Sequence, residues 1–347
     1  MKTTLSLLIK KYPIPAFFMI TIGLNYGLLF PAFFLPQTSL LNQLLVFYLA
    51  RMGVYSPVLA GVIVMTIINS ARQKIPFRRR MMVFVPVWVI ALVIHAADVS
   101  RTAPPETSVL FLALISMPVA LLPAFIISLA VGGATAVRQM LRTLLKPRGK
   151  FYFYLIALFT FPVVHFIGIV ITNVMFGERW IPPVNFGSSL LVDTGIVFLA
   201  VLFFSGGINE ESGWRGFAQA GLQKRYSPLM ANIILWFFLV LWHIPNDIVQ
   251  YREGGYVLVR IALYPFITII FGWIYNRTEG SILAPAVFHA SMNSMNVLGE
   301  ILPMTTAGNI LLVGLAIVVI IADRMWVRLP EKHPAVIQFQ SQFQSND

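Results

Sequence analysis

Residues 109–133 read VLFLALISMPVALLPAFIISLAVGG, an apolar run without a charged side chain. A helix needs roughly 20 apolar residues to cross a bilayer, so this run predicts a transmembrane helix. Comparable runs recur near residues 14–35, 54–70, 82–97, 152–176, 189–206, 229–245, 257–275, 281–298 and 308–323. A shorter apolar segment, 39–50, either lies in the membrane interface or extends the second span. The sequence therefore predicts an all-α, polytopic transmembrane helical bundle with about eight to ten spans.

The amino-acid composition is typical of a protein that is surrounded mainly by lipid. Hydrophobic residues make up 58% of the chain and charged residues only 11%, whereas soluble domains average about 25% charged. The sequence contains no cysteine, which excludes disulfides, thiolate metal sites and a cysteine nucleophile. A formal net charge of +12 can indicate either nucleic-acid binding or basic loops on the cytoplasmic side of a membrane. The positions of the cations favour basic cytoplasmic loops.

Basic residues crowd alternate connecting segments. They are Arg72, Lys74, Arg78, Arg79 and Arg80, then Arg138, Arg142, Lys146, Arg148 and Lys150, then Lys224, Arg225 and Arg277, and finally Arg324, Arg328 and Lys332. The segments 36–43, 98–107 and 177–188 carry few cations. This alternation predicts ten crossings with both termini in the cytoplasm. We expect a multi-pass protein of a bacterial cell membrane, in contact with membrane lipids and not with nucleic acid.

The chain divides into four regions by composition. Residues 1–188 form an N-terminal transmembrane region of unknown role, whose first run, 14–35, is interpreted as a retained span and not a signal peptide. Residues 189–300 form the candidate catalytic core, because the first half holds few ionisable groups inside its spans. Residues 301–329 contain the last span. The polar, glutamine-rich segment 330–347 is expected to be a disordered tail.

The first cluster of polar residues inside the apolar core is Asn209-Glu210-Glu211-Ser212-Gly213-Trp214-Arg215. A charged side chain in hydrocarbon costs roughly 2.5–3.5 kcal/mol, so it usually faces a partner or a cavity. Asn209 is a good N-cap, and Glu211 and Arg215 are spaced to pair on one helix face. That pairing leaves Glu210 available as a general base. The alternative is a first turn whose acids only complement the helix dipole.

Two further clusters carry the histidines. His243 closes the apolar run that begins at residue 229, where a lone histidine can be purely structural. His289 and Asn293 lie one helical turn apart in the run 281–298, so both side chains point the same way. They can stabilise an oxyanion or simply form interhelical hydrogen bonds. A base, two histidines and an amide on three consecutive elements are poorly explained as unrelated accidents.

Taken together, these motifs resemble the CPBP family, which includes the CAAX prenyl endopeptidases and the bacterial Abi proteins. The resemblance covers roughly residues 190–300. It rests on Glu-Glu-x-x-x-Arg at Glu210 to Arg215, on His243, and on His-x-x-x-Asn at His289 to Asn293. The family usually has Phe four residues before the middle histidine, and this chain has Leu239 there.

The resemblance implies an intramembrane endopeptidase that hydrolyses a peptide bond of a peptide or membrane protein. Glu210 would activate water, with His243 holding that water. His289 and Asn293 would stabilise the oxyanion. Glu211 and Arg215 would be supporting residues that orient the first motif. The alternative function is a non-catalytic membrane protein, either an immunity-type interaction protein or a transporter, with a polar intramembrane pathway.

No metal or other cofactor is expected, with zinc as the alternative. If a metal is present, Glu210, His243 and His289 are its candidate ligands. The metal-free reading is favoured because Asn is a poor zinc ligand and Glu211 is committed to Arg215. Simple span counting puts Glu210 and His243 at opposite ends of neighbouring spans. We therefore expect residues 209–227 to dip into the membrane around a water-filled cavity.

Overall fold

A computed structural model describes residues 4–36, 38–68, 76–101, 103, 106–131, 137–138, 144, 147–177, 188–251, 255–299 and 301–341. Within these residues the regular structure is entirely helical, and eight helical stretches are long and apolar enough to cross a membrane. The predicted all-α, polytopic membrane bundle is therefore confirmed. Some cations of the predicted cytoplasmic loops lie outside the described residues, namely Arg72, Lys74, Arg142 and Lys146.

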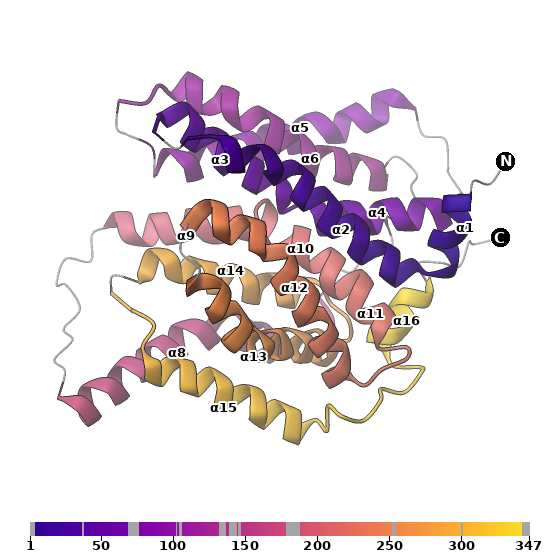
Figure 1. The fold of residues 1–347 in the computed structure, drawn as a ribbon, viewed down its shortest axis with the longest axis vertical. Coiled ribbons are helices and arrows are strands. Elements are labelled where there is room, and N and C mark those ends of the chain that lie inside the picture. Colours follow the sequence, from indigo (N-terminus) through magenta and orange to yellow (C-terminus); the bar gives the residue numbers. More distant parts are fainter. Residues whose placement is uncertain are drawn as a thin grey trace.

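The first half forms one group of helices, drawn from indigo to purple in Figure 1. Its elements are α1 (Thr4–Lys11), α2 (Pro13–Leu29), the 3-10 turn η1 (Phe30–Phe34), α3 (Leu40–Gly53), α4 (Ser56–Ile68), α5 (Phe77–Ser100) and α6 (Val109–Val131). The helices α5 and α6 pack along each other, and α2 packs against α3 and α4. This group covers the side of α10 that carries Gly213.

The second half forms the rest of the bundle. Its elements are α8 (Tyr152–Phe176), α9 (Ser188–Phe203), α10 (Gly207–Gly213), the π-helical turn η2 (Trp214–Gln219), α11 (Ala220–Leu222), α12 (Pro228–Tyr251), α13 (Gly255–Arg277), α14 (Leu283–Leu298), α15 (Thr306–Ala322) and α16 (Pro334–Ser341). The helix α14 packs against α8, α9, α10 and α13 and so lies at the centre of this half. Its position brings His289 and Asn293 into the interior.

Several predicted boundaries need correction. The segment 39–50 extends the second span, which runs from Leu41 to Ile68. The span predicted at 189–206 continues to Leu222 with a break at Ser205, so residues 207–222 cross onward and do not dip back. The runs 281–298 and 308–323 form α14 and α15, which are shorter than the eight candidate spans. The tail is not wholly disordered, because α16 buries Ala335 and Val336.

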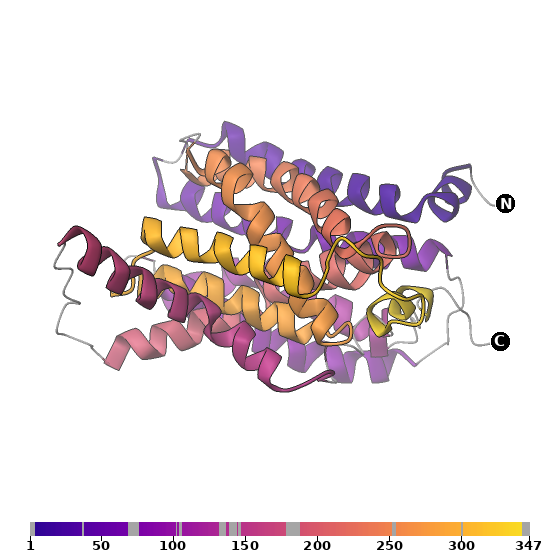
Figure 2. The ribbon, with the colours of Figure 1, turned by 90° about the horizontal axis from the view of Figure 1, so that it is seen from below.

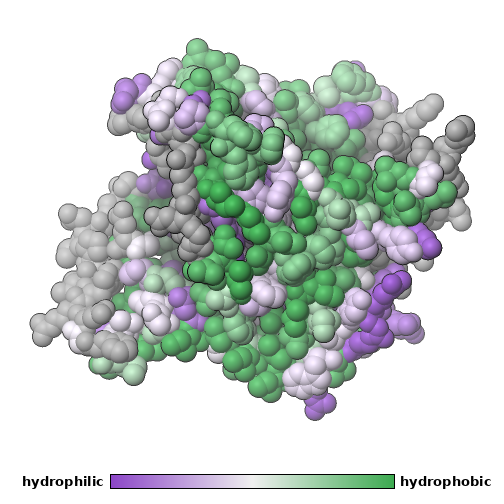
Figure 3. Space-filling view, viewed as in Figure 1, coloured by the Kyte–Doolittle hydropathy of each residue, from purple (hydrophilic) through white to green (hydrophobic). Residues whose placement is uncertain are grey.

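The outer surface of the bundle is apolar. Large side chains such as Phe125, Phe166 and Ile321 are exposed on α6, α8 and α15. In water this exposure would be costly, whereas lipid tails are as apolar as the side chains. Figure 3 shows hydrophobic surface over the middle of the molecule, with hydrophilic atoms visible in a hollow near the centre. The chain is an integral, multi-pass membrane protein.

The two ends of the bundle can be told apart. In Figures 1 and 2, α1 and α16 lie at the same end of the molecule. At that end α2, α5, α8, α12 and α14 begin, and α4, α13 and α15 finish. At the opposite end α3, α9 and α13 begin, and α5, α12 and α14 finish. We call these the terminal end and the distal end.

Gly213 allows α10 and α4 to approach closely, which gives a testable prediction. A Cβ at Gly213 would lie 2.5 Å from the carbonyl carbon of Pro57, a backbone atom that cannot move aside. Gly213→Ala is therefore expected to destabilise the protein by about 1–3 kcal/mol, as overpacking does. The measurement is thermal unfolding in detergent.

The matched control is Gly195→Ala in the middle of α9, where a Cβ meets no atom within 4 Å. This variant is expected to match or slightly exceed the wild-type stability, since Ala is a better helix former than Gly by about 1 kcal/mol. Equal stability of the two variants would contradict the close packing of α10 on α4.

Candidate active site

One cavity brings the predicted site residues together. It has a volume of ≈ 1140 Å³, and Glu210, His243, His289 and Asn293 all line it. Ligand pockets are commonly about 300–1,000 Å³, so this cavity has room for a short peptide segment. Glu211 and Arg215 lie on its wall as well.

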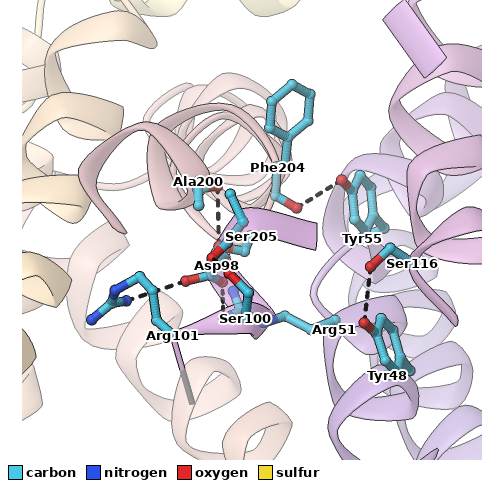
Figure 4. Close-up of polar contacts among 11 residues, drawn as sticks. Tyr48, Arg51, Tyr55, Asp98, Ser100, Arg101, Ser116, Ala200, Phe204 and Ser205 are labelled. Atoms are coloured by element: carbon cyan, nitrogen blue, oxygen red, sulfur yellow. Dashed lines mark hydrogen bonds and ion pairs between the residues drawn. The ribbon is translucent and has the colours of Figure 1, made fainter. Parts of the chain in front are cut away.

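The break between α9 and α10 places Glu210 inside the 33-residue apolar stretch Leu190–Leu222, away from both of its ends. The Phe204 carbonyl, left over at the end of α9, accepts a hydrogen bond from the Tyr55 hydroxyl at 2.7 Å. The Ser205 hydroxyl donates to the Ala200 carbonyl at 3.1 Å, as Figure 4 shows. The helix restarts at Gly207, so the prediction that Asn209 is an N-cap is wrong, and no side chain caps α10.

Glu210 is buried on α10, with 6% of its surface exposed, and borders the cavity. Across the described part of the chain, no residue hydrogen-bonds or ion-pairs with its carboxylate. A buried carboxylate in a membrane protein normally has a partner or faces water. The partner that offsets the free-energy cost of burying Glu210 must therefore come from the cavity.

Glu211 binds two partners at once. Its Oε2 lies 2.9 Å from Nη1 of Arg215, so the two predicted supporting residues do form an ion pair. Its Oε1 lies 2.9 Å from Nδ1 of His289, a contact that the sequence did not predict. The Arg215 guanidinium also stacks on the Phe271 ring at 4.3 Å from its centroid. Glu211 thus links α10 to α14 and fixes the orientation of the His289 ring.

This link determines what the other ring nitrogen of His289 can do. A carboxylate paired with arginine only accepts hydrogen bonds, so Nδ1 of His289 must donate. Nε2 is then an acceptor in the neutral ring and a donor in the protonated ring. A Cβ at position 206 would lie only 3.0 Å from this Nε2, so the glycine there leaves room for the His289 ring.

His243 is oriented by its own helix. Its Nδ1 donates to the Leu239 carbonyl at 2.8 Å, which leaves Nε2 of the neutral ring as an acceptor. The contact is made by the backbone of residue 239, so it does not depend on the Leu that replaces the usual Phe. The ring also packs edge-on against Trp242. The Trp242 carbonyl accepts a hydrogen bond from the Asn25 side-chain amide, and the Trp242 indole N–H donates one to the Ser56 hydroxyl, each at 2.7 Å.

Asn293 lies one turn beyond His289 on α14 and lines the same cavity. Among the described residues none hydrogen-bonds to its amide. Ser291 anchors this part of α14, because its hydroxyl donates to the Leu158 carbonyl of α8 at 2.6 Å. The amide of Asn293 is therefore available to a ligand in the cavity.

Comparison with known proteins agrees with this geometry. Residues 192–295 match the family model described as Type II CAAX prenyl endopeptidase Rce1-like, and this range contains all six motif residues. The resemblance to the CPBP family is confirmed. The CAAX prenyl protease 2 of Methanococcus maripaludis is 29% identical over 133 residues, which are 36% of this chain. The match covers 48% of that relative, so the chain spans about half of its length.

The Rce1-like region does not form the cavity alone. Arg51 and Arg101 from the first half line the cavity and both pair with Asp98, at 2.7 and 3.5 Å (Figure 4). Arg101 also reaches Asp193 of α9 at 3.2 Å. The first half of the chain therefore contributes charged residues to the cavity wall, in addition to those expected from the second half.

A second pair on the cavity wall was also missed. Asp247 lies one turn beyond His243 on α12 and forms a salt bridge with Arg260 of α13. The helical spacing from His243 could have identified Asp247, since residues one turn apart share a face. Nothing in the sequence pattern indicates Arg51 or Asp98 as neighbours of the site, because they come from separate helices of the first half.

The zinc alternative can be tested against the positions of the donors. Structural and catalytic zinc sites need at least three protein ligands converging on one point. Among the residues described, no group of three or more His, Cys, Asp or Glu side chains is close enough to share an ion. His289 uses Nδ1 to bind Glu211, so only its Nε2 could be a ligand. Glu210, His243 and His289 therefore line one cavity without forming a zinc-binding set in this arrangement.

Proposed function

We propose that this chain is a CAAX-type intramembrane endopeptidase in which Glu210 activates water for attack on a peptide bond. The observation that carries the proposal is the carboxylate of Glu210, which is buried at the wall of a large cavity and makes no hydrogen bond or ion pair with the described residues. The Rce1-like match favours a peptidase over a transporter or an immunity-type protein. Whether the substrate carries a prenyl group is left to experiment.

The proposed mechanism assigns one task to each residue. Nε2 of the neutral His243 accepts a hydrogen bond from the water and orients it. Glu210 removes a proton from the water as its oxygen attacks the carbonyl carbon. The amide of Asn293 and the protonated ring of His289, through Nε2, donate to the oxyanion that forms. Glu210 then passes the proton to the leaving amine as the C–N bond breaks.

Glu211 and Arg215 support this chemistry without touching the substrate. The ionised Glu211 accepts from Nδ1 of His289 and stabilises positive charge on the ring. That charge is what allows Nε2 to donate to an oxyanion. Arg215 positions the carboxylate of Glu211 through the 2.9 Å ion pair.

The test is cleavage of a defined substrate by the purified protein in proteoliposomes. Membrane-anchored peptides with and without a prenyl group are incubated with the protein, and new termini are identified by mass spectrometry. Time-dependent cleavage by wild type, absent in protein-free vesicles, is the expected result. Failure to cleave either series, by protein whose fold is verified by its unfolding transition, would argue for a non-catalytic role.

Removal of metal gives a further prediction. Protein treated with a strong chelator and shown by elemental analysis to be metal-free is expected to retain its cleavage rate. The reason is that Glu210, His243 and His289 do not converge as a set of three ligands. Loss of activity on stripping, restored by one equivalent of zinc, would replace this mechanism with a metalloprotease one.

A further inference from the structure

The cavity lies toward one end of the bundle. Helices α5, α12 and α14 line it only between about their middle and their distal ends, for example through Asp98, His243 and Asn296. Helices α9 and α13 line it from near their starts to beyond their middle, for example through Leu190, and α3 lines it along most of its length, beginning at Gln43. All these segments meet at the distal end, opposite α1 and α16 (Figure 1). Gln43 and Asn296 are exposed, so the polar lining reaches the surface there.

The cations of the described residues gather at the other end. Those at the terminal end are Lys10 and Lys11 in α1, Arg78, Arg79 and Arg80 at the start of α5, Arg148 and Lys150 before α8, Lys224 and Arg225 before α12, Arg277 at the end of α13, and Arg324, Arg328 and Lys332 after α15. The acidic residues described there are Glu279, Asp323 and Glu331. The terminal end is therefore strongly positive.

The distal end shows no such excess. Its described arginines, Arg51, Arg101 and Arg260, each form an ion pair with an aspartate. Glu106 adds a further negative charge there. Short loops rich in Lys and Arg remain in the cytoplasm during insertion, and the bias is set by these cations. By this rule the terminal end faces the cytoplasm and the distal end faces away from it.

We propose that the cavity opens to the extracytoplasmic side of the membrane and takes a polypeptide segment displayed on that side. The orientation follows from the charges and the position of the cavity. The substrate class rests additionally on the proposed peptidase function. Substrates are then exported or membrane-anchored polypeptides whose scissile bond lies beyond the cytoplasmic leaflet. A cytoplasmic peptide would have to pass the terminal half of the bundle to reach Glu210.

The absence of cysteine makes the orientation directly measurable, because the natural chain is already a cysteine-free background. Single cysteines are placed at exposed, uncharged or acidic positions, so that no cation is removed. Thr38→Cys and Ser108→Cys report the distal end. Tyr226→Cys and Glu331→Cys report the terminal end. Gln43→Cys and Asn296→Cys report the mouth of the cavity.

Intact cells expressing each variant are treated with a membrane-impermeant maleimide, before and after permeabilisation. The distal and mouth cysteines are expected to be labelled in intact cells, and labelling of the terminal cysteines is expected to be lost unless the cells are permeabilised. The reverse pattern would overturn the orientation. Distal labelling combined with mouth cysteines that react only after permeabilisation would overturn the position of the opening.

A second measurement separates the orientation from the chemistry. A membrane-anchored reporter carries the same cleavable segment on either the extracytoplasmic or the cytoplasmic side. Cleavage confined to the extracytoplasmic version is expected, and cleavage confined to the cytoplasmic version would overturn the substrate class. If neither reporter is cut while the labelling pattern holds, the peptidase function fails and the orientation stands.

Discussion

Glu210→Gln is expected to lower the rate of peptide cleavage by about 100- to 10,000-fold, the usual contribution of a general base. Gln keeps the size and shape of the side chain and removes the group that accepts the proton of the attacking water. The measurement is the turnover of a membrane-anchored peptide by the purified variant. Turnover at the wild-type rate would remove Glu210 from the mechanism.

The same substitution is expected to leave the fold intact. Glu210 has no ion pair or hydrogen bond through its side chain to any described residue, so its replacement by the isosteric Gln breaks no such bond. Loss of a buried charge without a partner can even stabilise a protein, because the desolvation cost disappears. Expression, membrane insertion and the unfolding temperature in detergent should therefore equal or exceed those of wild type.

The neighbouring carboxylate supplies a matched control. Glu211→Gln makes the same chemical change one residue away, but it removes the ion pair with Arg215 and weakens the bond to His289. It is expected to lower stability as well as activity, whereas Glu210→Gln lowers activity alone. A loss of stability in Glu210→Gln that matches the loss in Glu211→Gln would show that Glu210 is structural.

The sequence was sufficient to predict the helical bundle and several of the residues that line the cavity. Apolar runs identify helices that must satisfy their backbone hydrogen bonds internally, so the fold class follows from local information. Helical spacing likewise predicted that Glu211 reaches Arg215, and the structure places them 2.9 Å apart. The catalytic roles of Glu210, His243, His289 and Asn293 remain predictions.

What the sequence could not supply was the geometry across helices. The apolar pattern alone did not show that α9 continues through Ser205 and Gly206 into α10, so Glu210 was placed at a span end instead of inside the stretch Leu190–Leu222. The contact between Glu211 and His289 joins residues far apart in the chain, and nothing local encodes it. The same reason explains why Arg51 and Asp98 were not connected with the site.

The second large effect concerns the ion pair between Glu211 and Arg215 within the first motif. Arg215→Ala is expected to lower the free energy of unfolding by about 3–5 kcal/mol, because it leaves the buried carboxylate of Glu211 without its partner. Arg215 and Glu211 are exposed by only 2% and 1%, so water cannot replace the lost charge. The variant also loses the stacking of the guanidinium on Phe271.

An arginine in a more exposed pair provides the comparison for this prediction. Arg277 pairs with Asp323 near the terminal end, and 48% of its side chain is exposed. Arg277→Ala is expected to cost about 0–1 kcal/mol, as exposed ion pairs do, and to leave peptide cleavage unchanged. Thermal unfolding in detergent should therefore separate Arg215→Ala clearly from Arg277→Ala. Equal unfolding temperatures for the two variants would mean that water reaches the Glu211–Arg215 pair and that this pair contributes no more to stability than an exposed one.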